Sequence, residues 1–270
     1  MTQTAPDTIS ACHSALARDL GSQLELESIE VVQQVDQYRQ YWRPDKPRLV
    51  LLAESHVHTT ETELLSRLRP DSVRKDLAHG FVRFVYCLGY GENELLDKPL
   101  SPNSGTWQFW KIFYSCINLV QSNEDFAPML KAKTKLRERI NYKIELVEDM
   151  KAQGIWLVDA SHAALFRNGH PKIAKDLYEK ALQTCWTEHV RSVLEHPCRP
   201  EGILCIGCGV ARALKDRLEE LQIPWGAVPQ PGSHLSSKEH LRILKRYREV
   251  AKHPARVRSL CADLCGDLFS

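Results

Sequence analysis

Hydrophobic positions in the first 45 residues recur at the spacing of a helix. One series passes through Leu16 and Leu20, and a second passes through Val31, Val32 and Val35. Such spacing puts apolar side chains on one face of a helix, so we predict two helices here. They would form an N-terminal helical extension, residues 1–45, packed on an α/β domain of residues 46–270.

Farther along, four short apolar runs are bounded by turn residues, a pattern that predicts buried strands. The runs are Arg48–Ala53, Gly154–Asp159, Gly202–Gly207 and Trp225–Val228. The expected helices cover residues 61–68, 130–150, 210–221 and a stretch from 236 onward. Two of them should start with a capping box, at Thr60 and at Ser236. The alternation predicts an α/β fold of three layers, α/β/α, around a central, mainly parallel sheet of four or five strands.

Composition narrows the class of protein. The chain has 270 residues, 43% hydrophobic and 26% charged, which is ordinary for a folded protein with one core. We expect no membrane partner, because no apolar run reaches the roughly 20 residues of a membrane span and the N-terminus lacks an export signal. Nine cysteines, several of them in apolar segments, suggest reduced thiols and a cytoplasmic location.

The distribution of charge is more informative than its total. A net charge of +2 and a pI near 8.1 would not by themselves draw the protein to nucleic acid. A basic segment nevertheless runs from Ser236 to Arg258. Its cations are Lys238, Arg242, Lys245, Arg246, Arg248, Lys252, Arg256 and Arg258, against two glutamates. This segment is either a solvated helix face or a surface that contacts phosphates.

Two polar loops follow predicted strands and are the best places for chemistry, because ligands bind beyond the carboxyl ends of parallel strands. The first is residues 54–58 and the second is residues 229–234. In the first, Glu54, His56 and His58 offer three acid–base groups. Two alternatives stay open: a merely solvated loop, or a zinc site made by the same three side chains.

A second pair of motifs points to structure rather than to chemistry. Cys205 and Cys208 have CxxC spacing, but no second pair of ligands accompanies them and Cys205 lies inside an apolar strand. Gly207 and Gly209 lack the rest of a phosphate-binding loop, so a tight turn from strand to helix explains them better.

The run Leu49–Val57 resembles the first motif of the uracil-DNA glycosylase superfamily, in which a short strand ends in a catalytic loop. Ala53 stands at the place of the motif's first glycine, Glu54 at its glutamate and Ser55 at its catalytic aspartate or asparagine. The resemblance therefore implies that Ala53 contacts the extruded base. The run from Ile203 to Leu214 resembles the family's late strand and helix. The loop Pro229–His234 then holds the place of the family's second motif, which presses into the minor groove of DNA.

The resemblance implies a monofunctional DNA glycosylase that extrudes a base and hydrolyses its N-glycosidic bond. Glu54, Ser55 and His56 would serve catalysis, with Gln230 or His234 donating to the departing base. The remaining loop residues and three cations of the basic segment would hold DNA: Pro231, Gly232, Ser233, Arg242, Lys245 and Arg246. We expect DNA as the partner, a monomer, and no metal or other cofactor, since the cysteine pair of the family's iron–sulfur branch is missing.

Asp159 ends the strand that would carry the family's base-reading asparagine. An ionised carboxylate only accepts hydrogen bonds, so it would pair with an exocyclic amine such as N4 of cytosine. The resemblance thus suggests a modified cytosine as substrate, although Asp159 could equally cap a helix. Tyr90, which lies between two glycines, is the best candidate to stack on the base, ahead of Trp107, Phe109 and Trp110.

Two other functions fit parts of the sequence. The same strand end resembles erythromycin-esterase-like and haem-binding ChaN-like proteins, in which Glu54 and His56 would act together. Alternatively, the chain binds nucleic acid without catalysis, and DNA binding that survives Glu54→Ala with no product would identify that case.

Overall fold

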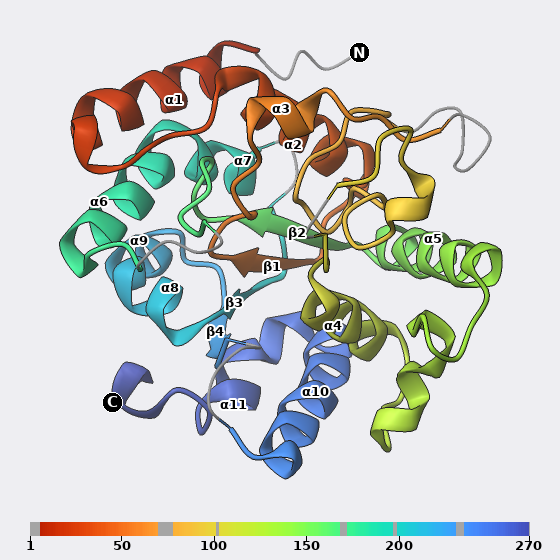
Figure 1. Cartoon of the computed structure of the whole chain (residues 1–270). Coiled ribbons are helices and arrows are strands. Elements are labelled where there is room, and N and C mark those ends of the chain that lie inside the picture. Colours follow the sequence, from red (N-terminus) through yellow and green to blue (C-terminus); the bar gives the residue numbers. More distant parts are fainter. Residues whose placement is uncertain are drawn as a thin grey trace. The chain divides into compact units, whose positions relative to one another are not determined.

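The computed structural model describes residues 6–69, 78–100, 103–167, 172–196, 199–230 and 235–269 (Figure 1). The contacts divide the chain into two compact units. Unit 1 contains residues 1–41, 54–105 and 159–197, and unit 2 contains residues 42–53, 106–158 and 198–270. Each unit combines separate stretches of the chain, so the predicted boundary between residues 45 and 46 stays a prediction.

Unit 2 contains the sheet. Its strands are β1 (Leu49–Ala53), β2 (Ile155–Asp159, whose last residue belongs to unit 1), β3 (Gly202–Ile206) and β4 (Trp225–Val228). They lie in the order β2-β1-β3-β4, and β3 pairs in parallel with both β1 and β4. All residues of the four strands are buried, as in a sheet covered on both faces. The predicted three-layer α/β/α class is therefore confirmed, with four strands.

The helices of unit 2 are α4 (Trp107–Ile117), α5 (Leu136–Ala152), α8 (Cys208–Ala213), α9 (Lys215–Glu220), α10 (Ser237–Lys252) and α11 (Val257–Cys261). Helices α8 and α11 pack on β3 and β4, and α10 packs on α4. Gly226 of β4 permits the contact with α11, because an added Cβ would lie 2.8 Å from the carbonyl oxygen of Val257.

Apart from Asp159 of β2, the described residues of unit 1 form helices and loops. Its helices are α1 (Pro6–Leu20), α2 (Ile29–Tyr41), the short α3 (Glu61–Leu64), α6 (Lys175–Cys185), a π-helical turn (Trp186–Val190) and α7 (Arg191–Glu195). The two helices predicted before residue 45 are thus present. Helix α1 packs on α2, on α6 and on the π-helical turn, burying Leu16 and Leu20.

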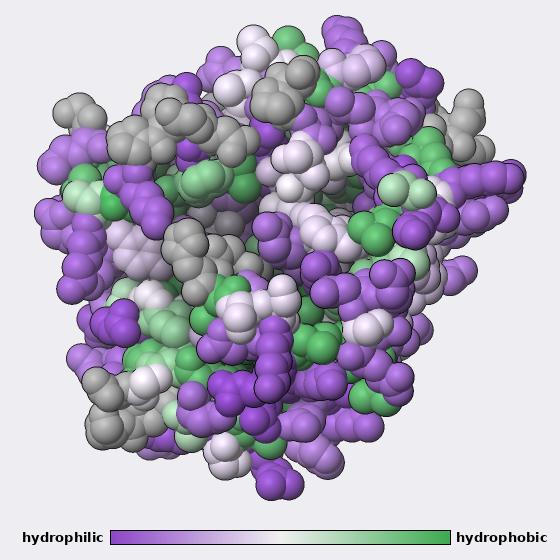
Figure 2. Space-filling view, turned by 60° about the horizontal axis from the view of Figure 1, so that its bottom comes forward, coloured by the Kyte–Doolittle hydropathy of each residue, from purple (hydrophilic) through white to green (hydrophobic). Residues whose placement is uncertain are grey.

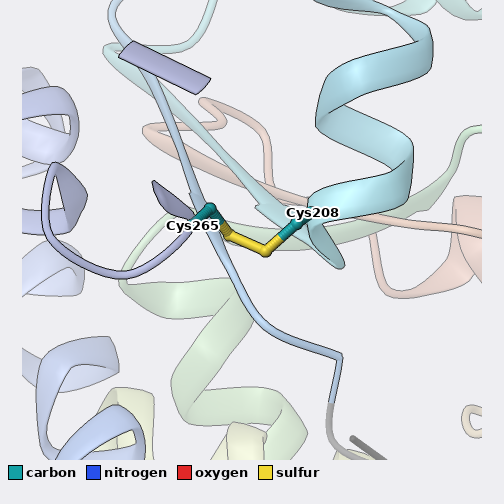
Figure 3. Close-up of a disulfide and its surroundings, with 2 residues drawn as sticks. All are labelled: Cys208 and Cys265. Carbon is teal, nitrogen blue, oxygen red and sulfur yellow. A yellow bond between two sulfur atoms is a disulfide. The ribbon is translucent and has the colours of Figure 1, made fainter. Parts of the chain in front are cut away.

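One expectation about the cysteines is wrong. Cys208, at the start of α8, forms a disulfide with Cys265, 57 residues later (Figure 3). The bridge is possible because the chain after α11 returns to α8, a contact that spacing along the sequence does not reveal. Six other described cysteines are free and buried: Cys12, Cys87, Cys116, Cys185, Cys205 and Cys261.

Figure 2 shows a face that is mostly polar, with hydrophobic residues interspersed among the polar ones. Large hydrophobic side chains that are exposed among the described residues include Leu65, Leu119 and Phe166. None of the helices in the described part of the chain combines the length and the apolar character needed to cross a membrane.

Candidate functional site

Glu54 follows β1 directly and is partly buried. Burial raises the pKa of its carboxyl group, and the negative charge of Asp159 acts in the same direction. A hydrogen bond from Tyr178 and the charge of Lys172 oppose this rise. The result is a carboxyl group near the protein surface that exchanges a proton closer to neutral pH than an ordinary glutamate does.

The loop that carries Glu54 is tied to the segment after β2. Ser161 donates its backbone N–H to the carbonyl oxygen of Glu54 at 2.9 Å, and His58 donates to Phe166 at 3.0 Å. The hydroxyl of Ser55 accepts the N–H of Leu165 at 3.0 Å and donates to the carbonyl of His56 at 3.0 Å. Ser55 therefore holds two loops together, and its predicted catalytic role stays a prediction.

His56 lies inside unit 1, with 3% of its surface exposed. Its Nε2 is 2.7 Å from a carboxylate oxygen of Glu27, and its Nδ1 is 3.6 Å from Oδ2 of Asp159. Burial opposes the charged form, but the two carboxylates outweigh burial and raise the pKa of His56 to about 9. His56 is therefore an imidazolium at neutral pH, held between two acids.

Glu27 organises the surroundings of His56. One carboxylate oxygen accepts the N–H of Thr59 at 2.5 Å, and the other accepts the N–H of Ala164 at 3.1 Å. Burial alone would raise the pKa of Glu27, yet His56 and these hydrogen bonds lower it. A buried carboxylate thus orients both loops that follow β1 and β2.

Asp159, at the end of β2, is equally buried, with 2% of its surface exposed. Its Oδ2 accepts a hydrogen bond from Nη2 of Arg39 at 2.8 Å, and Nη1 of Arg39 lies 3.0 Å from Asp36. Burial opposes ionisation of Asp159, but His56 and Arg39 lower its pKa. The expected open carboxylate is therefore an internal ion pair, and its role in reading a base stays a prediction.

The other predicted base-binding residues are also internal. Ala53 is the last residue of β1 and is 1% exposed. Tyr90 is 5% exposed; its ring packs edge-on against Phe81, and Arg83 lies over it at 5.8 Å. The glycines around Tyr90 shape a buried turn, because an added Cβ on Gly105 would lie 2.8 Å from Gly91 Cα. Tyr90 thus fills the interior of unit 1.

Metal-ligating side chains gather elsewhere than in the zinc site that was left open as an alternative for the first loop. In the part of the chain that the structure describes, Glu54, His56 and His58 do not form a set of ligands. Asp36, His162 and His189 do: their ligand atoms all lie within 4.8 Å of one another, and all three residues are buried.

The predicted DNA-binding residues belong to unit 2. Residues 231–234, which include Pro231, Gly232, Ser233 and His234, lie outside the described residues, and Gln230 is exposed at the end of β4. The predicted capping box at Ser236 and Glu239 starts α10. Arg242 and Lys245 are exposed on this helix, while Arg246 is partly exposed and pairs with Glu249 at 2.9 Å.

A cavity of about 200 Å³ opens beside the first turns of α10. Its polar lining includes Lys111 of α4, and Ser237 and His240 of α10; Pro229 also lines it. Lys111 lies over the rings of Trp107 and Phe126, and burial lowers its pKa. Of the aromatic residues considered for stacking on a base, Trp107 and Phe109 of α4 are partly buried and Trp110 is buried.

Sequence reasoning missed Glu27, Asp36 and Arg39. Asp36 and Arg39 follow Val32 and Val35 at helical spacing, so two opposite charges lie on the apolar face of α2. That pattern was a usable signal, because charged residues are rarely buried unless they are paired. Glu27 lies before the helix in a polar stretch and carried no signal.

Comparison with models of known protein families and with curated proteins finds no match to this chain.

Proposed function

We propose that the protein is a monofunctional DNA glycosylase that uses Glu54 to hydrolyse the N-glycosidic bond of an extruded base. The observation that carries this proposal is the partly buried carboxyl of Glu54, with its raised pKa, directly after β1. Such a carboxyl group is suited to orient water and to stabilise the positive charge that develops on the sugar. The α/β class agrees with the fold that the resemblance implies.

The buried ion pairs support this role by positioning. Glu27 binds His56 of the loop that carries Glu54 and Ala164 of the loop after β2, and Asp159 lies on the other side of His56, so these residues fix the two loops to each other. A catalytic carboxylate loses effectiveness when it moves by about 1 Å, so rigid neighbours matter. His56 and Asp159 are therefore positioning residues in this proposal, and Glu54 is the group that faces the substrate.

The proposed substrate is a modified base of the cytosine type. For Asp159 to accept a hydrogen bond from the amine of such a base, its ion pair with Arg39 would first have to open. The exposed cations of α10 would contact phosphates and so contribute to binding.

The test is an excision assay. Oligonucleotides that carry uracil, hypoxanthine, methylcytosine, hydroxymethylcytosine or glucosylated hydroxymethylcytosine are incubated with the protein, and abasic sites are scored. We expect cleavage of at least one modified cytosine, with a loss of about 100-fold or more in rate for Glu54→Gln.

The matched control is Glu61→Gln, an exposed glutamate at the start of α3. It should cleave like the unmodified protein. No abasic product with any base, or equal rates for the Glu54 and Glu61 variants, would exclude the mechanism. DNA binding that depends on salt, survives Glu54→Gln and yields no product would identify a non-catalytic nucleic-acid-binding protein instead.

The geometry does not favour the esterase-like alternative. It needs His56 as a partner of Glu54 in catalysis, but His56 is buried and its Nε2 is bound to Glu27. A hydrolase of that class would require this pair to open first.

We further propose that the protein acts as a monomer in the cytoplasm. The six buried free cysteines support a reducing location, and the disulfide Cys208–Cys265 argues against it. Cell fractionation of the full chain, followed by size determination in solution, checks both proposals.

A further inference from the structure

Three buried side chains of unit 1 converge on one point. Asp36 comes from α2, His162 from the loop after β2 and His189 from the π-helical turn, and their ligand atoms lie within 4.8 Å of one another. They are 8%, 2% and 6% exposed, respectively. Two imidazoles and a carboxylate form a donor set that divalent transition metals prefer.

His162 is the member that calls for a ligand. Among the described residues, neither of its ring nitrogens has a hydrogen-bond partner, although both are buried. Its ring centroid lies 4.0 Å from that of His189. Buried polar groups are normally paired, so an imidazole with two unpaired nitrogens is unexplained without a ligand at this point.

The other two members are oriented for the same purpose. Nδ1 of His189 lies 3.2 Å from the hydroxyl of Thr8; when Nδ1 donates to that oxygen, Nε2 keeps its lone pair. Ligating histidines are commonly held by such a hydrogen bond on the other ring nitrogen. Oδ1 of Asp36 accepts hydrogen bonds from Arg39 at 3.0 Å and from Gln40 at 3.5 Å, and Oδ2 is the oxygen that would bind the cation.

The charge state of the cluster also suits a cation. Both imidazoles are buried, and the neutral imidazole that a buried site favours is the form that binds metal. Three carboxylates, Glu27, Asp36 and Asp159, are buried nearby with one guanidinium, Arg39. Even with His56 protonated, the negative charges exceed the positive ones by one.

We propose that Asp36, His162 and His189 bind one divalent transition-metal ion with the ligand preference of zinc. The ion would join α2, the loop after β2 and the π-helical turn, and a water or other small ligand would complete its coordination. The metal would then hold the loop after β2 and the π-helical turn in place from inside unit 1. Glu54 is not one of the three ligands, and the proposed metal takes no part in the proposed hydrolysis.

Zinc binding to the purified full chain tests this inference. The protein is freed of metal with a chelator, dialysed against buffered Zn²⁺, and its zinc is counted by elemental analysis. We expect one zinc per chain and a higher melting temperature with zinc. His162→Gln and His189→Gln should each weaken binding by about 100-fold or more. The exposed His196, mutated to Gln, is the matched control and should bind like the unmodified protein.

Cobalt substitution of the unmodified protein keeps the test decisive if a variant fails to fold. Co²⁺ bound through nitrogen and oxygen gives visible bands without thiolate charge transfer, which would support the proposal. A thiolate band would place the metal on the nearby cysteines Cys12 and Cys185 and overturn it. Absence of stoichiometric metal, or full binding in both histidine variants, would overturn it as well. No outcome depends on glycosylase activity.

Discussion

At the scale of single residues, His56 keeps a proton between Glu27 and Asp159 inside unit 1. Its pKa of about 9 exceeds the value of about 6.5 for an unfolded chain. A raised pKa means that the folded state binds the proton more tightly. This stabilisation is fully present below about pH 6.5 and is lost as the pH rises through about 9.

We therefore predict that the free energy of unfolding falls between pH 6.5 and 8.5 because of His56. The full contribution is on the order of 3 kcal/mol, and most of it should vanish across this range. Urea denaturation at a series of pH values measures the fall in the unmodified protein and its reduction in His56→Gln.

His58→Gln is the matched control. Burial lowers the pKa of His58, so its titration changes the free energy of unfolding only below about pH 6.5. The His58→Gln variant should therefore show the same fall between about pH 6.5 and 8.5 as the unmodified protein. Equal pH dependence in the two variants would show that His56 does not carry the proton.

Single residues of the candidate site were predictable from the sequence, but contacts between residues far apart in the chain were not. Glu54 was found because a polar residue directly after an apolar run lies at a strand end. Asp159 was found in the same way, but its partner Arg39 is 120 residues away in the sequence, so its pairing was not predictable. The cluster of Asp36, His162 and His189 likewise depends on three distant segments meeting.

At the scale of elements, apolar runs located the strands, and the two capping boxes located the starts of α3 and α10. The helix expected from residue 130 begins only at Leu136. Helix ends were less predictable. The helix expected at 61–68 stops at Leu64, because Arg67 and Leu68 pair with Gly80 and Leu96 instead. The helix expected at 210–221 divides at Leu214, whose buried side chain accompanies a non-helical backbone. Contacts with distant parts of the chain decide where these two helices end, and the local sequence does not reveal such contacts.

Helix α10 carries the prediction that belongs to this scale. Its exposed Lys245 should contact a phosphate if the protein binds DNA. Lys245→Gln should weaken binding equally across sequences and reduce the slope of log K against log salt by about 1. Fluorescence anisotropy with duplexes at several salt concentrations measures this slope.

The exposed Lys133, outside α10, provides the matched variant Lys133→Gln, which should leave the slope unchanged. If the two lysine variants behave alike, α10 is a solvated face and the phosphate-binding surface lies elsewhere.

At the scale of the whole molecule, each compact unit is assembled from segments that are far apart in the sequence. Unit 1 contains the buried ion pairs of His56 and Arg39, whereas unit 2 contains the sheet and the disulfide. The order of the strands in the sheet differs from their order in the chain. As a result β1 pairs with β3, which begins about 150 residues later. Such contacts follow from burial of the whole sheet and not from any local pattern.

The disulfide between Cys208 and Cys265 makes the last prediction. Cross-linking residues 57 positions apart restricts the unfolded chain, and for a loop of that length the expected stabilisation is up to about 4 kcal/mol. The double variant Cys208→Ser/Cys265→Ser should therefore unfold at lower urea concentration. Reductant should destabilise the unmodified protein toward the same value and leave the double variant unaffected. If reductant leaves the unmodified protein unchanged, the two thiols are not bridged in solution, and the C-terminal segment is held by its packing alone.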